Sequence, residues 1–238
     1  MAHNIHPDSE IPIKRYAIGP VFRKNKAGGQ PRSVIECDLD FVYSKTNDML
    51  YEAETLKIAF EILGSVSPLD LDQHLILVNN TLGLSKTLIS CNVPNRLFQG
   101  VVNILEQLHN PFSTQHVKLM MTAIGVSANS AEKLLDLDSR VLVSACKELN
   151  IEKEYVPEIM LLQKHLEGLG LGKSLAFSPL LVNSNVYSGL IFQIIRKTRG
   201  RFDVVAAGGR YESLIQTFQS PFLRPNNLNA VGIHICNF

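Results

Sequence analysis

IGPVFRKNKAGGQPRSVIECDLDF, residues 18–41, is the stretch that decides the fold. Two runs with β-strand character, AIGPVF and SVIECDLDFVY, lie on either side of a polar loop with two glycines, KNKAGGQP. This arrangement is typical of a β-hairpin. No acidic residue occurs between Ile11 and Ile35, and the cations on the hairpin and its shoulders are Lys14, Arg15, Arg23, Lys24, Lys26 and Arg32. The hairpin therefore carries a concentrated positive charge.

The overall composition does not explain this cluster. The chain has 238 residues, with 23 Lys and Arg against 22 Asp and Glu, and a formal net charge of +1. Its hydrophobic content of 45% is that of an ordinary globular protein, with room for one large domain or two modest ones. Focused positive charge on a nearly neutral chain attracts polyanions, so a nucleic acid or a nucleotide is the expected class of partner. A solvated, charged loop is the alternative.

Cysteine usage and the start of the chain indicate an intracellular, soluble protein. The four cysteines show no CxxC spacing, which argues against a zinc site or a disulfide framework. The start, MAHNIHPDSEIPIK, is too polar for a signal peptide, and no run approaches the roughly 20 apolar residues of a membrane span. We therefore expect a cytoplasmic protein with no membrane partner, no metal and no cofactor.

Strand and helix patterns alternate near both ends of the chain and enclose a helical middle. Residues 47–66 show helical spacing of apolar residues, with Asn47 or Asp48 as cap and Gly64 as stop, and residues 73–80 show a buried-strand pattern. Leucine-rich helical segments follow from about residue 94 to 171, and strand patterns return in 186–197, 201–209 and 229–237. We expect an α/β protein with an antiparallel sheet flanked by helices. The expected parts are a first core segment (1–92), a mainly helical insertion (93–178) and a second core segment (179–238).

A second group of cations follows the strand pattern VYSGLIFQII. Its members are Arg196, Lys197, Arg199 and Arg201, and no acidic residue intervenes before Asp203. The two groups together hold ten of the 23 Lys and Arg residues. If the strands pair in one sheet, both groups can border one cleft with a strongly positive potential.

The stretch AAGGRYESLI, residues 206–215, joins a strand pattern to a helix start. Paired glycines permit close backbone approach or a positive φ, as in loops that hold phosphates. A plain strand-to-helix turn, in which Arg210 makes a local salt bridge, is the alternative. For Arg210 we expect the structural role.

The order of these pieces resembles histidyl-tRNA synthetase, a class II enzyme. Motif 2 of that class is a strand–loop–strand with an arginine near the end of its first strand, which matches Phe22-Arg23. The family signature RGLDYY…VFE, followed by AGGRYDGL, resembles Val182–Gln193 and Ala207–Leu214. The helical middle lies where the family has its insertion domain. The resemblance implies a class II synthetase-like fold over nearly the whole chain.

Several positions depart from the family pattern inside the matched segments. The family arginine that grips the ATP α-phosphate is retained as Arg23, but the acidic residue that helps to engage ATP is Asn25. The phenylalanine that stacks on adenine is Val34, which has no aromatic face. The catalytic arginine of RGLDYY is Val182, and the glutamate that contacts the amino acid is Gln193. Because adenylation depends on preorganised charge, the resemblance implies a degenerate domain with no catalytic residue.

Two further family motifs have no counterpart. Motif 1 precedes motif 2 in the family, and the ATP-binding arginine of GLER in motif 3 has no match in AVGIHICNF. We therefore expect the chain to be a part of a longer protein. Since class II synthetases dimerise largely through motif 1, the oligomeric state of this part stays open.

Among synthetase-like regulators, the wording IKRYAIGPVFR and VVAAGGRY is most similar to the domain that adjoins the general amino-acid-control kinase. That kinase phosphorylates translation initiation factor two alpha. The resemblance implies that the domain binds uncharged tRNA, regulates the adjoining kinase domain in amino-acid starvation and forms a homodimer in the full-length protein. The alternatives are an active histidyl-tRNA synthetase fragment, a dimerisation scaffold and the regulatory subunit of ATP phosphoribosyltransferase. The residues expected to contact tRNA are Lys14, Arg15, Arg23, Lys24, Lys26, Arg32, Arg196, Lys197, Arg199 and Arg201.

Overall fold

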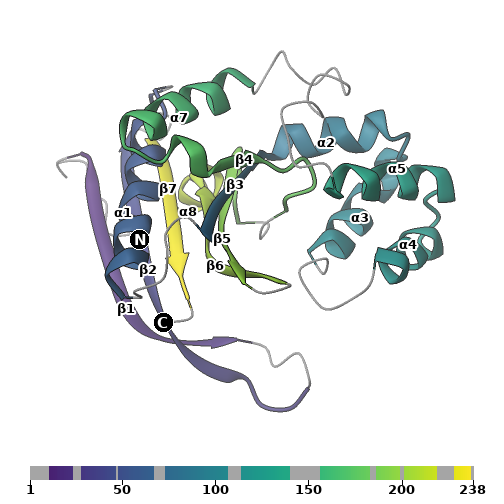
Figure 1. The fold of residues 1–238 in the computed structure, drawn as a ribbon, viewed down its shortest axis with the longest axis horizontal. Helices are drawn as coiled ribbons and strands as arrows, with labels where there is room; N and C mark the ends of the chain where they lie inside the picture. Colours follow the sequence, from purple (N-terminus) through teal and green to yellow (C-terminus); the bar gives the residue numbers. More distant parts are fainter. Residues whose placement is uncertain are drawn as a thin grey trace.

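The computed structural model describes a mixed sheet with helices packed on it and a group of further helices beside it (Figure 1). The described residues are 11–23, 28–46, 48–66, 73–106, 114–139, 156–182, 186–198, 201–218 and 228–236. The helical pattern expected around residues 139–150 lies almost wholly outside them. The prediction of an α/β fold with helices flanking the sheet is confirmed.

Seven strands form one sheet in the order β1-β2-β7-β6-β5-β3-β4. All neighbouring strands are antiparallel except β3 and β4, which are parallel. The strands are β1 (Ile13–Arg23), β2 (Arg32–Ser44), β3 (His74–Asn80), β4 (Leu175–Phe177), β5 (Leu190–Thr198), β6 (Arg201–Arg210) and β7 (Leu228–Ile235). Strands from residues 13–80 thus pair with strands from residues 190–235, so the expected assembly of the sheet from both ends of the chain is confirmed.

The described helices lie where the sequence pattern indicates helices, except for one further helix, α2. They are α1 (Leu50–Val66), α2 (Thr81–Ser90), α3 (Phe98–Leu105), α4 (Thr114–Ala123), α5 (Ala128–Ser139), α7 (Val156–Gly168) and α8 (Glu212–Phe218), with single 3₁₀ turns η3 (Asn95–Leu97) and η4 (Gly172–Ser174). At the start of α1, Asp48 accepts a hydrogen bond from the Leu50 N–H at 3.2 Å, while the expected stop at Gly64 is wrong, because the helix continues to Val66. Neither α2 nor the three-residue strand β4 is evident from the sequence pattern. α2 begins at Asn80, whose side chain accepts a hydrogen bond from the Leu82 N–H at 2.9 Å.

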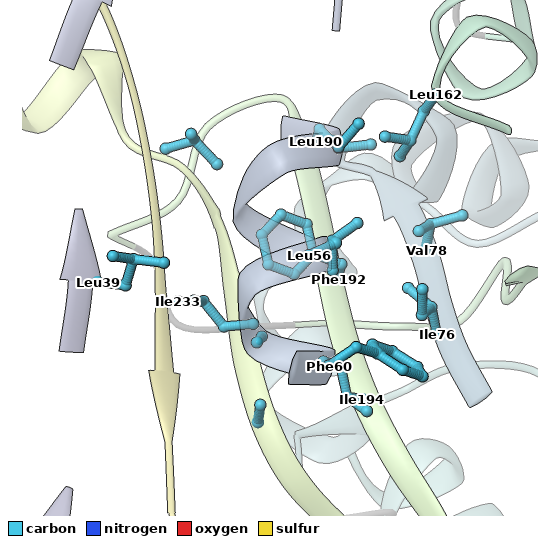
Figure 2. Packing of buried hydrophobic residues seen from close by; sticks show 14 of the residues in the cluster. Leu39, Leu56, Phe60, Ile76, Val78, Leu162, Leu190, Phe192, Ile194 and Ile233 are labelled. Carbon is cyan, nitrogen blue, oxygen red and sulfur yellow. The ribbon is translucent and has the colours of Figure 1, made fainter. Parts of the chain in front are cut away.

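The main core lies between one face of the sheet and helices α1 and α7 (Figure 2). Leu56 and Phe60 of α1 and Leu162 of α7 pack with Phe192 and Ile194 of β5, and all five are at most 2% exposed. Burying each such side chain contributes about 1.5–3 kcal/mol. These helices therefore cover one face of the sheet, while Ile215 of α8 packs with Val42 and Ala230 on the opposite face.

A second core joins α2, α3, α4 and α5. It includes Val101, Met121 and Leu134, all fully buried, together with Leu180 and Val182 from the segment after β4. Helix α7 and strand β4 fall within residues 93–178 but pack with the main core through Leu162, Leu166 and Phe177. The division into residues 1–92, 93–178 and 179–238 stays a prediction.

The described ranges contain free cysteines but neither a cluster of metal ligands nor a membrane-spanning helix. Cys37, Cys91 and Cys236 are free thiols, and Cys146 lies outside the described residues. No group of three potential metal ligands occurs in the part of the chain that the structure describes. None of the helices in these ranges combines the length and the hydropathy needed to cross a membrane.

The run AAGGR of β6 contains a glycine at a point where the chain is crowded on two sides. A Cβ atom on Gly208 would lie 2.2 Å from the carbonyl oxygen of Gly232 and 2.5 Å from the ring of Phe192. No side chain fits at such distances without movement of the backbone or of the core. The expectation that the paired glycines permit close backbone approach is confirmed.

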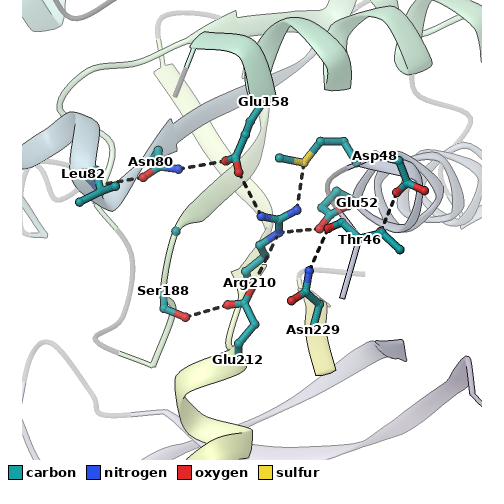
Figure 3. Close-up of polar contacts among 12 residues, drawn as sticks. Thr46, Asp48, Glu52, Asn80, Leu82, Glu158, Ser188, Arg210, Glu212 and Asn229 are labelled. Carbon is teal, nitrogen blue, oxygen red and sulfur yellow. Dashed lines mark hydrogen bonds and ion pairs between the residues drawn. The ribbon is translucent and has the colours of Figure 1, made fainter. Parts of the chain in front are cut away.

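Arg210 at the end of β6 is the centre of a buried ion-pair network (Figure 3). Its Nε lies 2.6 Å from Oε1 of Glu52 on α1 and 3.8 Å from Oε1 of Glu212 on α8, and its Nη1 lies 3.5 Å from Oε1 of Glu158 on α7. The side chains of Arg210 and Glu52 are 9% and 1% exposed. Tyr43 also donates a hydrogen bond to Glu52. Arg210 therefore ties the sheet to three helices, in agreement with the structural role expected for it.

Substitution of Gly208 by alanine is expected to lower the free energy of unfolding by about 2 kcal/mol or more, because β7 or Phe192 must move in a close-packed sheet. Gly19→Ala is the matched control, since Gly19 also lies in a strand and a Cβ atom added there would have nothing within 4 Å. That control is expected to change stability by less than about 0.5 kcal/mol. Urea unfolding measures both, and equal losses would contradict the close approach at Gly208.

The variant Arg210→Gln is expected to lose about 3–5 kcal/mol of stability, because it leaves the buried carboxylate of Glu52 without its cation. Lys57→Gln is the control: it also removes the cation of an ion pair, with Glu61 at 3.5 Å, but on the exposed surface of α1. A surface pair of this kind contributes less than about 1 kcal/mol. Thermal and urea unfolding give both values, and a loss at Arg210 no larger than at Lys57 would rule out the proposed tie.

Candidate functional site

The β1–β2 hairpin presents the first group of cations. β1 and β2 pair in register from Ile13 opposite Val42 to Arg23 opposite Arg32, and in Figure 1 the hairpin curves where it extends beyond the rest of the sheet. Gly28 and Gly29 beyond Arg23 have φ angles of +85° and +87°, which residues with a side chain rarely adopt. Lys24, Asn25 and Lys26 lie outside the described residues.

The β5–β6 hairpin presents the second group. Its last pair is Thr198 opposite Arg201. Lys197 is exposed near the end of β5, and Arg201 is the first residue of β6. Arg199 lies outside the described residues.

Both hairpins turn at the same end of the sheet. Four antiparallel pairings separate β1 from β5, so these two strands run in the same direction and their turns lie at one end. Only β7 lies between β2 and β6, and both strands pair with it as far as Ile235, which is opposite Cys37 and Ala206. The condition for a shared positive surface, that the strands pair in one sheet, is therefore met.

Four of the expected contact cations are held by carboxylates. Nζ of Lys14 lies 2.6 Å from Oε1 of Glu54, Nε of Arg15 lies 3.8 Å from Oδ2 of Asp40, and Nη2 of Arg196 lies 3.5 Å from Oδ2 of Asp203. Arg23 pairs with Glu36.

Arg32 and Lys197 differ from these four. Both are exposed, and no carboxylate of the described residues pairs with either. The uncompensated positive charge of the described hairpins therefore lies near the two turns.

The pair of Arg23 and Glu36 uses both carboxylate oxygens. Nε of Arg23 donates to Oε1 of Glu36 at 2.7 Å, and Nη2 donates to Oε2. This hydrogen bonding raises the pKa of Arg23 above its ordinary value. The side chain of Glu36 is 3% exposed, whereas that of Arg23 is 54% exposed. The arginine that matches the α-phosphate ligand of the synthetases is thus already engaged by a buried acid.

Glu36 is the first of a row of acidic side chains, here called the acidic row, on the face of the sheet that points away from α1. Glu36, Asp38 and Asp40 alternate along β2 with Cys37, Leu39 and Phe41, which belong to the main core. The letters ECDLD show this alternation, but the partner of Glu36 is not its register neighbour, which is Gly19. The ion pair with Arg23 was therefore not predictable from spacing alone.

A cavity of about 230 Å³ opens on the same face, between β1, β2, β7 and the segments around Tyr187 and Tyr211. Asp38, Asp40 and His234 also line it, and the Tyr211 hydroxyl donates to Oδ1 of Asp40 at 2.7 Å. Loss of solvent raises the pKa values of Asp40 and Tyr211 and raises that of Tyr187 to about 12. Loss of solvent also lowers the pKa of His234, so that its ring stays neutral at neutral pH. The cavity offers hydroxyl, carboxylate and imidazole groups together with the guanidinium of Arg15, and it suits a small polar ligand.

Three of the positions that depart from the synthetase pattern are buried or half-buried in the sheet or in the second core. Val34 is half-buried on β2, opposite Val21. Val182 is 3% exposed and belongs to the second core. Gln193 is buried in β5, and its Oε1 has no hydrogen-bond partner in the described part of the chain. Phe192 packs in the main core, and Tyr187 packs against the smaller cluster that contains Tyr211 and also lines the cavity.

Comparison with curated proteins finds similarity to two groups. The chain is 29% identical over 244 residues to histidine–tRNA ligase 1 of Bacillus cereus, which covers 96% of this chain and 53% of that protein. It is 30% identical over 244 residues to the eIF-2-alpha kinase GCN2 of Mus musculus, which covers 94% of this chain and 15% of that protein. The chain thus spans about half the length of the bacterial ligase and a smaller part of the kinase. No protein-family profile matches the chain.

Solved structures agree on the architecture. Histidyl-tRNA synthetase from Nostoc sp. PCC 7120 superposes with a TM-score of 0.74 at 24% identity, over 96% of this chain and 53% of that one. A structure from Bacillus halodurans, described as an ATP phosphoribosyltransferase regulatory subunit or histidyl-tRNA synthetase, gives a TM-score of 0.69 at 17% identity, over 96% of this chain and 57% of that one. The chain therefore has a histidyl-tRNA synthetase-like class II fold, and its sequence is homologous both to bacterial histidine–tRNA ligases and to GCN2 kinases.

Proposed function

We propose that this chain is a non-catalytic, synthetase-like domain that binds uncharged tRNA and regulates an adjoining protein kinase in translational control. The kinase part of the proposal rests on the homology to GCN2. In this proposal the parent protein is a cytoplasmic serine/threonine kinase that responds to amino-acid starvation and pairs with a second copy of itself.

The main support for the proposal is the distribution of charge: carboxylates predominate on the face of the acidic row, and unpaired cations lie near the hairpin turns. On the sheet face that carries the acidic row, Arg23 is paired with Glu36, and Asp38 and Asp40, which line the cavity, add further negative charge. Near the turns, Arg32 and Lys197 are exposed without an acidic partner in the described ranges. Such a charge distribution repels a nucleoside triphosphate from the face of the acidic row and attracts an RNA backbone to the turns.

Exposed aromatic side chains on the first hairpin favour RNA over a small anion. Tyr16 and Phe22 of β1 are each 74% exposed, which is unusual for large apolar side chains. Proteins that bind single-stranded nucleic acid combine cations with aromatic rings on which bases stack. The first hairpin supplies both features, and we assign it the acceptor end of the tRNA.

The loop cations Lys24 and Lys26, with Arg32, are the first contacts in this proposal, and Lys197, Arg199 and Arg201 form the second group. Lys14, Arg15, Arg23 and Arg196 are held by carboxylates and contribute less to phosphate binding. Binding through phosphates releases counterions, so affinity falls steeply as salt rises.

Replacing Lys24, Lys26 and Arg32 together by alanine is expected to weaken binding of deacylated tRNA and to lower the slope of log affinity against log salt by about 2–3, or 0.7–0.9 per lost phosphate contact. Filter binding or fluorescence anisotropy across a salt series measures both quantities. The charge-matched control replaces Lys57, Lys164 and Lys173, which lie on α1, α7 and η4, by alanine. That control is expected to retain the wild-type slope.

Two outcomes would contradict the proposal. Unchanged tRNA affinity in the triple hairpin variant would show that these cations do not bind tRNA, and no binding by the wild-type chain would leave a dimerisation scaffold as the role of the domain. ATP–pyrophosphate exchange above background in the full-length parent protein would instead identify an active synthetase.

A further inference from the structure

Glu36 is bonded to the guanidinium of Arg23, the group that a phosphate would bind. A guanidinium binds carboxylate and phosphate in the same way, through two parallel N–H···O bonds. In this chain Nε and Nη2 of Arg23 are both bonded to Glu36, with 2.7 Å between Nε and Oε1. A phosphate can take this two-point position only after Glu36 has left it.

The surroundings keep Glu36 in place. Its side chain is only 3% exposed while Arg23 is paired with it, so the carboxylate depends on Arg23 for its compensating charge. A buried carboxylate without a cation is strongly unfavourable, so the state in which Arg23 is bonded to Glu36 is more stable than the state in which they are apart. Arg23 itself is 54% exposed and would be reachable by a ligand if the acid were absent.

The rest of this face adds to the effect. On it, the guanidinium groups of Arg15 and Arg23 meet three carboxylates, those of Glu36, Asp38 and Asp40. His234 lies on the cavity wall and adds no positive charge, since its ring is neutral at neutral pH. A polyphosphate that approaches this face of the sheet therefore meets more negative than positive charge.

We infer that Glu36 is a specificity-determining residue: by bonding both donor groups of Arg23, it excludes polyphosphates from this face of the sheet and so confines phosphate binding to the hairpin turns. This inference rests on the proposed function and deepens it, because it explains how a synthetase-like sheet discriminates between a nucleoside triphosphate and an RNA backbone. The retained arginine is thus part of the exclusion of ATP and not a remnant of its binding.

The test compares the wild-type chain with Glu36→Gln, which keeps the side-chain volume and one acceptor but removes the charge. The probes are Mg-ATP and inorganic tripolyphosphate, measured by calorimetry, and the second probe needs no adenine contact. Glu36→Gln is expected to bind both probes at least about tenfold more tightly than wild type, which corresponds to about 1.4 kcal/mol. The double variant Arg23→Ala with Glu36→Gln is expected to lose this gain.

Asp38→Asn is the matched control, because it removes the same charge from the next position of the acidic row. It is expected to gain less than about threefold, since the ion pair of Arg23 with Glu36 stays closed. The inference is overturned by a folded Glu36→Gln chain with no gain, by an equal gain in Asp38→Asn, or by a gain that survives the loss of Arg23. Circular dichroism and thermal unfolding establish that each variant is folded.

A measurement on the wild-type chain needs no variant. In a ¹⁵N spectrum, the Arg23 Nε–H signal is expected to stay at its position during a tripolyphosphate titration, and movement of this signal with saturation would overturn the inference. Binding of deacylated tRNA to the wild-type chain tests the proposed function separately. A chain that fails to bind tRNA but gains polyphosphate binding in Glu36→Gln would refute the proposed function and leave the role of Glu36 in excluding polyphosphates standing.

Discussion

Strand β7 pairs with β2 on one side and with β6 on the other, and these two pairings hold the two halves of the sheet together. β2 comes from the first 44 residues and β7 from the last described segment, so this pairing closes the sheet across the whole length of the chain. It also requires Gly208 and Gly232 to approach closely, with no room for a side chain at Gly208. Because β1 and β5 then run in the same direction, both cationic hairpins turn at one end of the sheet.

Much of this arrangement was predictable, because hairpins and buried strands have short-range patterns. The β1–β2 hairpin follows from two β-branched runs around a glycine-containing loop, and β6 follows from an apolar run that ends in paired glycines. Helix α2 is not evident, since TLGLSKTLIS contains a glycine and few good helix formers and depends on the Asn80 cap and on the second core.

The electrostatic part of the site was less predictable, because ion pairs join residues that are distant in sequence or out of register. Lys14 and Glu54 are separated by 40 positions, and Arg23 reaches Glu36 although its register partner is Arg32. A count of cations on the hairpin therefore overstates the charge that remains available for a ligand. The structure leaves exposed, unpaired cations near the turns and a row of carboxylates on one face of β2, and this separation of charge is the basis of our proposal that the domain binds RNA and not ATP.

The most direct test of this account is hydrogen exchange of the chain with deacylated tRNA and, separately, with Mg-ATP. We predict that tRNA slows exchange in peptides that cover residues 18–35 and 195–203, at the turns of the two hairpins, and that Mg-ATP changes no peptide. Protection of the sheet face around residues 36–40 and 232–236 by Mg-ATP, without protection of the hairpin turns by tRNA, would contradict it.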